Sequence, residues 1–342
     1  MITPFGLRHI WLMRELQNAS TVLDLRSTLL EPETPLRAAL RGYFLKSSSG
    51  IITYVLRAPN YTSWRGFAQA RAHKSGLAWS IVRMAPALDS SEDAATVWYR
   101  LLLHLCIAAG ERCVQRLFAC LPEDSPAEEV FRQASFAVYC HERVFWRSPA
   151  DMVKGALSPR MHLMRPENRL DVQRLCYKVT PRLVLQAEEL ALRPIEGPND
   201  SWVNSQLFKV PSSDPEQSYV LCGDNREIWG CLHLLLGSRG SWLRVLAQPD
   251  TGDFAAEMLD HALAVLSNYP SRPLYCTVRE YEQGMPALLE ERGFTLAGTY
   301  SLLVKHTTVR VKEPRYKLVP ALEKRAEIAP TVSRSEAELE VR

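Results

Sequence analysis

Residues 79–86 read WSIVRMAP, and residues 242–249 read WLRVLAQP. Each stretch is an apolar strand pattern that ends at a proline, and each leads into a long stretch of helical periodicity. The tryptophan and the proline are seven residues apart in both stretches, and the second stretch follows the first by 163 residues. A repeat on this scale predicts two domains of one fold, with both tryptophans as core residues of a strand.

Other features of the repeat lie on either side of these two stretches. Gly66 precedes the first stretch and Gly230 the second, while Phe136 and Phe294 each open a closing apolar strand. Each copy reads as three strands, a helix, a strand, a second helix and a last strand. This order is typical of an α/β (α+β) fold in which strands outnumber helices.

The repeat and the composition divide the chain into four segments. We expect an N-terminal domain at 1–147, a linker at 148–168, a C-terminal domain at 169–310 and a tail at 311–342. The linker is rich in proline and glycine, which interrupt regular structure. Thirteen of the 32 tail residues are charged and aromatic residues are almost absent, so the tail is expected to be disordered or weakly helical.

The composition excludes several classes of protein. Apolar residues make up 46% of the chain and charged residues 23%, which is typical of a globular protein. The formal charge of +3 gives no basic stripe, so no nucleic-acid partner is expected. No apolar run reaches 18 residues, so no membrane span is expected either. Eight cysteines without a C-x-x-C pair indicate no metal site and a reducing, cytoplasmic location.

The element order and the paired motifs resemble the GCN5-related N-acetyltransferase (GNAT) superfamily. The resemblance rests on the two strand–proline–helix stretches, on the motifs FRQASF (131–136) and LEERGF (289–294), and on the apolar strand after each motif. It covers residues 50–147 and 217–306. The resemblance implies two acetyltransferase-like domains, each a twisted mixed sheet flanked by helices, with acetyl-CoA as the cofactor.

In that family a glycine-rich loop, roughly Q/R-x-x-G-x-G/A, opens the helix after the proline-ended strand. Backbone N–H groups at this helix end bind the pyrophosphate of acyl-CoA, and glycine allows the close approach. The C-terminal loop QPDTGDFAAEML keeps one glycine and a small pair, although it has two aspartates and no basic residue. The resemblance therefore implies a cofactor site at Leu246, Gln248, Thr251, Gly252, Asp253, Phe254, Ala255 and Ala256.

The N-terminal loop, PALDSSEDAATVWYRLL, departs further from the family pattern. Thr96 and Trp98 occupy the glycine positions, and the loop is about five residues longer than the family's. Its three acidic residues would repel a pyrophosphate, and a tryptophan at a position of close approach would fill the site. Cofactor binding is accordingly expected in the C-terminal copy rather than in the N-terminal one.

No catalytic residue is assigned from the sequence. The family often has a tyrosine general acid five residues before the phenylalanine of its Y-x-x-x-G-F type pattern. Phe131 and Leu289 stand there in this chain, and neither can transfer a proton. Tyr139 and Tyr300 follow the phenylalanines on the last strands, where an aromatic residue is more often part of the core or surface than an acid.

Four further candidates have a structural as well as a functional interpretation. His104 and His261 lie within the long helices and have no second ligand at i+3 or i+4, so neither indicates a metal site. The run Cys140–His141–Glu142 contains a nucleophile and a base, but neighbouring strand residues point to opposite faces. Glu227 opens the second strand of the C-terminal copy, either as an acid acting through water or as an exposed charge.

Two functions of different classes follow. The first is a GNAT-like acyltransferase that moves an acetyl group from acetyl-CoA to an unidentified amine of a small molecule or peptide. The second is a catalytically silent tandem protein with a binding, regulatory or scaffold role. The loop of the C-terminal copy is closer to the family's glycine-rich pattern, which favours the first function. The glycines and tyrosines missing from both copies favour the second. Neither the acceptor nor the oligomeric state follows from the sequence.

Overall fold

A computed structural model of the chain describes most of its residues. The described ranges are 1–30, 32–45, 50–58, 61–73, 75–149, 155–188, 216–223, 227–248 and 252–307. The expected tail at 311–342 lies outside them. Residues within Met1–Arg310 form one compact unit.

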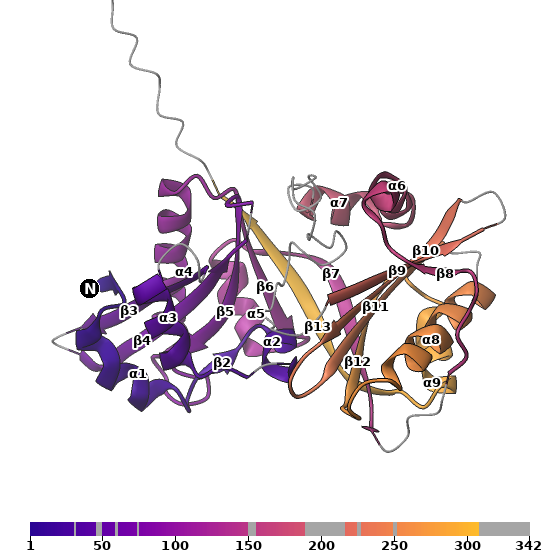
Figure 1. Cartoon of the computed structure of the whole chain (residues 1–342). Helices are drawn as coiled ribbons and strands as arrows, with labels where there is room; N and C mark the ends of the chain where they lie inside the picture. The colour runs from indigo at the N-terminus through magenta and orange to yellow at the C-terminus, as the bar shows by residue number, and fades with distance from the viewer. Residues whose placement is uncertain are drawn as a thin grey trace, which may run out of the picture. The chain divides into compact units, whose positions relative to one another are not determined.

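The helices and strands follow the order that the sequence predicts, with additions near both ends of the pattern (Figure 1). The N-terminal half contains β1 (Ile2–Pro4), η1 (Leu7–His9), α1 (Ile10–Leu16), β2 (Thr21–Val22), α2 (Leu25–Leu30), α3 (Pro35–Leu45), β3 (Ile51–Ala58), β4 (Tyr61–Ala72), β5 (Ala78–Ala85), α4 (Ala94–Glu111), β6 (Arg116–Pro122), α5 (Pro126–Gln133) and β7 (Ala137–Arg147). The C-terminal half contains β8 (Met161–Leu163), η3 (Pro166–Asn168), α6 (Arg169–Val179), α7 (Arg182–Glu188), β9 (Glu216–Cys222), β10 (Ile228–Leu236), β11 (Ser241–Ala247), α8 (Gly252–Leu266), β12 (Leu274–Arg279), α9 (Met285–Glu291) and β13 (Thr295–His306). The predicted linker at 148–168 thus includes a short strand and a 3-10 turn.

One mixed sheet runs through both halves. Its strand order is β1-β3-β4-β5-β6-β13-β7-β12-β11-β10-β9-β8, and β2 pairs with β5 outside this path. Most neighbours are antiparallel, while β5–β6 and β11–β12 are parallel. Each parallel pair is joined by a long helix, α4 or α8, as parallel neighbours require. The α/β class with helices flanking a mixed sheet is confirmed.

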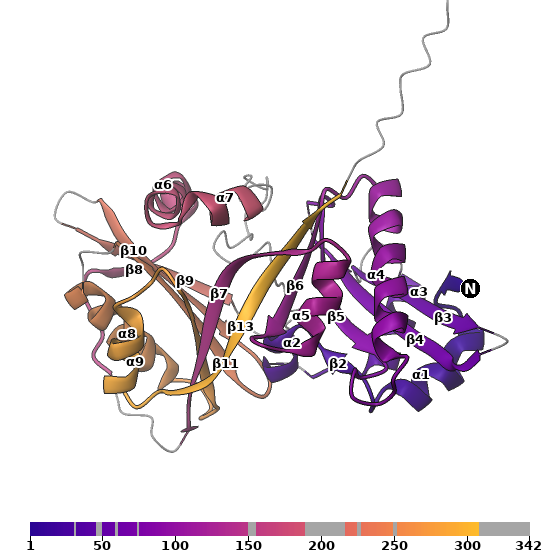
Figure 2. The ribbon, with the colours of Figure 1, turned by 180° about the vertical axis from the view of Figure 1, so that it is seen from behind.

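The closing strands of the two halves lie side by side at the centre of the sheet (Figure 2). Strand β13 lies between β6 and β7, and β7 lies between β13 and β12. Each closing strand therefore pairs with the fourth long strand of the other half. The backbone ladder crosses between the predicted domains 1–147 and 169–310, whose boundaries stay a prediction.

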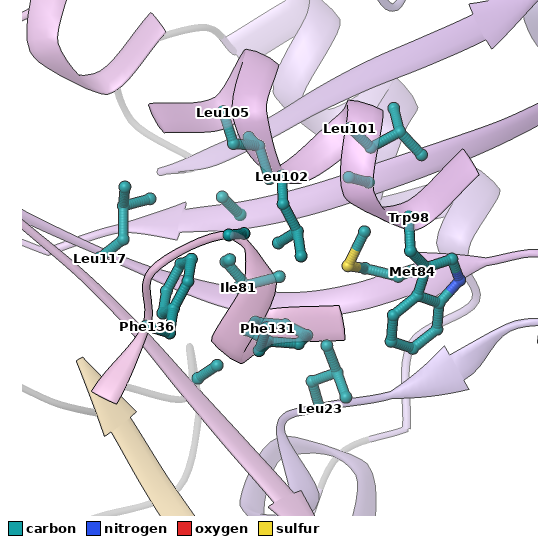
Figure 3. Close-up of a cluster of buried hydrophobic side chains, with 14 of the residues drawn as sticks. Leu23, Ile81, Met84, Trp98, Leu101, Leu102, Leu105, Leu117, Phe131 and Phe136 are labelled. Atoms are coloured by element: carbon teal, nitrogen blue, oxygen red, sulfur yellow. The ribbon is translucent and has the colours of Figure 1, made fainter. Parts of the chain in front are cut away.

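Two apolar cores pack the long helices onto this sheet. The first joins α4 and α5 to β3–β6 and includes Trp98 and Phe131 (Figure 3), and the second joins α8 and α9 to β9–β12. The repeated glycines serve this packing. A Cβ at Gly66 would collide with the Val97 side chain of α4, and one at Gly230 would collide with Met258 of α8. The missing side chain thus lets each helix close onto the second strand of its half.

Trp79 and Trp242 are core residues, as the repeat predicts, since both are 2% exposed. They nevertheless face opposite sides of the sheet. Trp79 belongs to the core under α4, whereas Trp242 packs with Leu30 on the face away from α8. A β-bulge in β5 explains the difference, because the ladder with β4 skips Val82 while the β10–β11 ladder is continuous. One extra residue reverses which face the preceding side chains point to.

Candidate functional site

The parallel strand pair in each half separates before its strands end. The β5–β6 ladder ends at Ser80 and Phe118, although β5 continues to Ala85. The β11–β12 ladder ends at Arg244 and Thr277, and β11 continues to Ala247. Each pair thus leaves a wedge at its carboxyl end, where the chain also enters the long helix. In open α/β sheets ligands bind at such carboxyl ends.

The wedge of the N-terminal half contains part of the chain itself. β2 pairs antiparallel with β5 at Met84 and Arg83, beyond the last β5–β6 pair. Trp98 fills the space beside the loop, because its side chain is fully buried and its indole Nε1 donates to the Pro86 carbonyl at 2.6 Å. These residues do not fit a cofactor, since both the strand edge and the close-approach position are occupied.

The predicted site residues of the C-terminal half lie around the end of β11 and the start of α8. Gly252 is the first residue of α8, and Asp253 in its first turn is exposed. Leu246 is 4% exposed and packs with α6 residues on the opposite face of the sheet from α8. Ala255 packs into the core under α8. Side chains of Leu246 and Ala255 are therefore unavailable to a ligand, and only their backbone could contribute.

The other site residues contact groups from distant parts of the chain. Phe254 stacks on Trp229, with ring centroids 4.7 Å apart, and the Arg160 guanidinium lies 5.0 Å from the Phe254 ring. The backbone N–H of Gln248 donates to the Trp229 carbonyl at 3.2 Å. The side-chain oxygen of Gln248 accepts a hydrogen bond from Lys178 Nζ at 3.0 Å. Ala256 is half-buried and follows on α8. Thr251 lies outside the described residues.

Two basic side chains therefore contact Gln248 and Phe254, the residues on either side of a loop whose sequence has no basic residue. Lys178 comes from the end of α6, and Arg160 comes from the segment before β8. Arg160 is also paired with Glu257 on α8, which offsets part of its charge. The sequence could not place either residue, because each is 70 or more positions from the residue it contacts. Arg160 thus places positive charge near the first turn of α8, where it favours a bound phosphate.

A buried ion pair fixes the base of this wedge. The Arg244 guanidinium donates to both oxygens of Glu282, at 2.5 and 2.7 Å, and to the Thr277 carbonyl at 2.9 Å. Glu282 also accepts the backbone N–H of Arg279 at 2.9 Å. The neighbouring carboxylate of Glu282 raises the pKa of Arg244 against the opposing effect of burial. The pair ties β11 to the connection after β12 at the point where the strands separate.

Further charges are buried beside this pair, on the face of the sheet opposite α8. Arg279 Nη1 lies 2.8 Å from Glu188 Oε1, and Tyr139 donates to the same oxygen at 2.9 Å. Burial and the Glu188 carboxylate raise the pKa of Tyr139 well above its usual value. Burial likewise raises the pKa of Tyr281 to about 12. Neither tyrosine has the near-neutral pKa that suits a general acid.

The remaining sequence candidates are placed in structural roles. His261 is 5% exposed and accepts the Ser158 N–H at 3.2 Å, and His104 packs on Tyr54. Burial lowers the pKa of both histidines. Cys140 is 1% exposed, and burial raises the pKa of its thiol to about 12, so it is no thiolate nucleophile. Glu227 is an exposed residue just before β10.

The aromatic and aliphatic residues at the family's acid positions are likewise structural. Phe131 and Leu289 are fully buried in the two cores. Tyr300 is half-buried and pairs with Glu142 across the sheet. In the described ranges no cluster of three or more metal-ligating side chains occurs. No helix among the described residues has the length and apolar character needed to cross a bilayer.

A separate cavity of about 590 Å³ lies in the N-terminal half. The cavity is lined by Thr53 of β3, Gly42 of α3 and Trp79 of β5. Arg112 also lines it, and its guanidinium lies 5.4 Å from the Trp79 ring. Trp79 is near the start of β5, whereas the wedge opens at the end of that strand. The cavity is therefore distinct from the wedge.

Comparisons with solved structures agree with this architecture. A tandem GNAT protein from the clavulanic acid biosynthesis pathway, solved without AcCoA, is 12% identical with a TM-score of 0.51, over 90% of this chain and 98% of its own. A GCN5-related N-acetyltransferase from Sphaerobacter thermophilus is 13% identical with a TM-score of 0.49, over 90% of this chain and 95% of its own. No protein-family model matches the chain, and no curated protein matches its sequence. At such low identity the likeness defines the fold, which is that of the GNAT acetyltransferases.

Proposed function

We propose that the chain is a tandem of two divergent GNAT domains, in which the C-terminal half binds acetyl-CoA and transfers its acetyl group to an amine. The observation that carries this proposal is the wedge after Arg244, where β11 leaves β12 and leads towards the N-terminus of α8. A tandem GNAT protein is among the solved structures that share the fold of this chain. Fold alone does not assign the activity, so the residues of the wedge must support it.

The backbone of β11 supplies the first support. The Gln248 N–H bonds to the Trp229 carbonyl of β10, and amides of successive strand residues point to alternate sides. Amides of Val245 and Ala247 therefore point away from β10, towards the wedge. The β11–β12 ladder has ended before both residues. Their N–H and C=O groups are suited to pair with an extended, amide-containing chain such as the pantetheine arm.

The loop and the helix start supply the second. The N-terminus of α8 carries the unpaired amides and partial positive charge of a helix end, and α8 is 15 residues long. Arg160 adds a positive charge beside Phe254 in the first turn of α8, and Lys178 adds a second one at Gln248, just after β11. Asp253 in the first turn opposes an anion, so these two basic residues are needed to make the region favourable to a pyrophosphate.

The chemistry asked of this chain is modest. When bound, acetyl-CoA would supply an activated thioester carbonyl. The N–H groups at the edge of β11 would stabilise negative charge on that carbonyl oxygen, as preorganised backbone donors do in acyl transfer. The Arg244–Glu282 pair would hold the two strands apart at a fixed separation and so position those donors. The acceptor we propose is an amine of a small molecule or peptide, in a cytoplasm that keeps the eight free cysteines reduced.

Calorimetry of the full chain with acetyl-CoA tests the proposal. We expect micromolar binding that is lost in Gly252→Trp, because a large side chain at the start of α8 would block close approach to the backbone. The matched control is Ser91→Trp, an exposed position in the corresponding loop of the N-terminal half. Equal loss in both variants, or unchanged binding in Gly252→Trp, would place the cofactor elsewhere.

A silent binding or scaffold protein is the second candidate. The filled wedge of the N-terminal half and the buried Phe131 and Leu289 at the acid positions favour it. Under this alternative the full chain gives no heat with acetyl-CoA, and the buried charge cluster serves only to join the two halves. The same calorimetric experiment therefore separates the two candidates.

A further inference from the structure

The wedge of the N-terminal half is occupied over its length by residues 19–24. Strand β5 has two edges, and β4 occupies one of them, with Ala68 opposite Met84. Because Thr21 is also opposite Met84, β2 must lie along the other edge, which faces β6. β6 has left that edge after Ser80. The short strand β2 thus takes the place that β6 vacates.

Backbone hydrogen bonds extend this pairing beyond the two residues of β2. The Leu23 N–H donates to the Val82 carbonyl at 2.9 Å, and the Ala87 N–H donates to the Ala19 carbonyl at 2.6 Å. Val82 is the bulge residue of β5, so its carbonyl has no partner in the regular β4 ladder. Residues 19–23 therefore bind the edge of β5 from Val82 onward and contact Ala87 beyond its end, as an added strand binds a sheet edge.

Two side chains anchor the segment. Leu23 is 2% exposed and packs in the core cluster that includes Met84, Trp98 and Phe131 (Figure 3). The Asp24 carboxylate is 2.5 Å from Arg71 on β4, and its side chain is 2% exposed. A buried carboxylate is strongly unfavourable without such a partner. Both anchors must be removed from their sites before the segment can leave the wedge.

The helix that follows the segment is held by the other half of the chain. Leu30 of α2 is 1% exposed and packs with Trp242, and its carbonyl accepts the Arg239 N–H at 3.1 Å. Gly237 makes room for it, because a Cβ there would collide with Leu30. Arg26 lies over the Trp242 ring at 5.0 Å. The segment is consequently held through the helix that follows it as well as along β5.

We propose that residues Ala19–Asp24 are the permanent occupant of the N-terminal wedge, so that the chain takes up acyl-CoA at the C-terminal half alone. The second part of this statement rests on the proposed function. The first part does not, because the occupancy follows from the pairing, the two hydrogen bonds and the two buried anchors.

A disulfide across β2 and β5 tests whether the segment must move. Val22 and Arg83 are directly opposite, and the Leu23–Val82 hydrogen bond makes theirs the non-hydrogen-bonded pair, which is the closer type. In the full chain carrying Val22→Cys and Arg83→Cys, we expect oxidation to leave one acetyl-CoA bound per chain, with a Kd within twofold of the reduced form. Arg83→Cys alone, oxidised in parallel, controls for the native cysteines. Binding lost on oxidation, or two sites per reduced chain, would overturn the proposal.

Amide hydrogen exchange gives a readout that does not depend on cofactor binding. We expect the amides of Leu23 and Ala87 to exchange at least a hundredfold more slowly than unprotected amides, with or without acetyl-CoA. Exchange at the unprotected rate, or loss of protection when acetyl-CoA is added, would show that the segment is a movable lid. If the wild-type chain bound no acetyl-CoA at all, the proposed function would fail while slow exchange would still support the occupied wedge.

Discussion

Replacing Leu23 with alanine should destabilise the folded chain by about 3 kcal/mol. The side chain is 2% exposed and is surrounded by the core under α4 and α5. Truncation to alanine removes three carbon atoms, worth about 0.8 kcal/mol each in transfer from water, which gives about 2.4 kcal/mol. The cavity left behind adds to this, and buried Leu→Ala changes cost about 2–5 kcal/mol in all.

Urea unfolding measures this loss. With an m-value of about 3 kcal/mol/M, a loss of about 3 kcal/mol lowers the midpoint by about 1 M. The matched control is Leu7→Ala, because Leu7 is 48% exposed and should change stability by less than about 0.5 kcal/mol. An m-value that is the same in both variants as in the wild-type chain would show that all three proteins unfold in the same transition. If the two variants unfolded at the same midpoint, Leu23 would not be a core anchor and the occupied wedge would lose its main support.

Three other perturbations have expected outcomes. Glu282→Gln leaves the Arg244 charge buried without its carboxylate and should cost about 3–5 kcal/mol in thermal unfolding, whereas exposed Glu280→Gln should cost little. Burial lowers the pKa of His73 to about 3. As the pH falls below about 6.5, this imidazole is therefore protonated in the unfolded chain while it stays neutral in the folded chain. Wild type should therefore lose up to about 2 kcal/mol more than His73→Asn between pH 7 and pH 5 in urea titrations, and equal losses would contradict the assignment. Residues 160–310 expressed alone lack β7 between β12 and β13, so size-exclusion chromatography should show aggregates, and a well-behaved monomer would contradict the shared sheet.

The sequence predicted most of the elements because their signals are local. The apolar stretch at 79–86 lies in β5 apart from its proline, and the helical periodicity after it is α4. β2 gave no such signal, since two residues cannot show a period. Its position depends on a sheet edge more than 60 residues away, which no local pattern records.

The candidate site was predicted in part. Gly252 was expected within the loop of a cofactor site and is the first residue of α8, and its binding role stays a prediction. Lys178 and Arg160 were not predicted beside Phe254 and Gln248, because only the folded sheet brings them together. Arg244 and Glu282 carry no motif, so their pairing at the base of the wedge could not be recognised before the structure.

The sequence alone determined the repeated α/β pattern, because hydrophobic periodicity and the glycine and proline positions act within a few residues of each other. The tertiary structure decided how the two patterns are joined and which wedge is free of β2. β7 and β13 each pair with a strand of the other half, and β2 pairs with the edge of β5. In each case the paired residues are distant in sequence. A strand edge offers the same N–H and C=O groups to any extended segment, so the selection depends on which side chains, such as Leu23 and Asp24, can be buried and paired beside it.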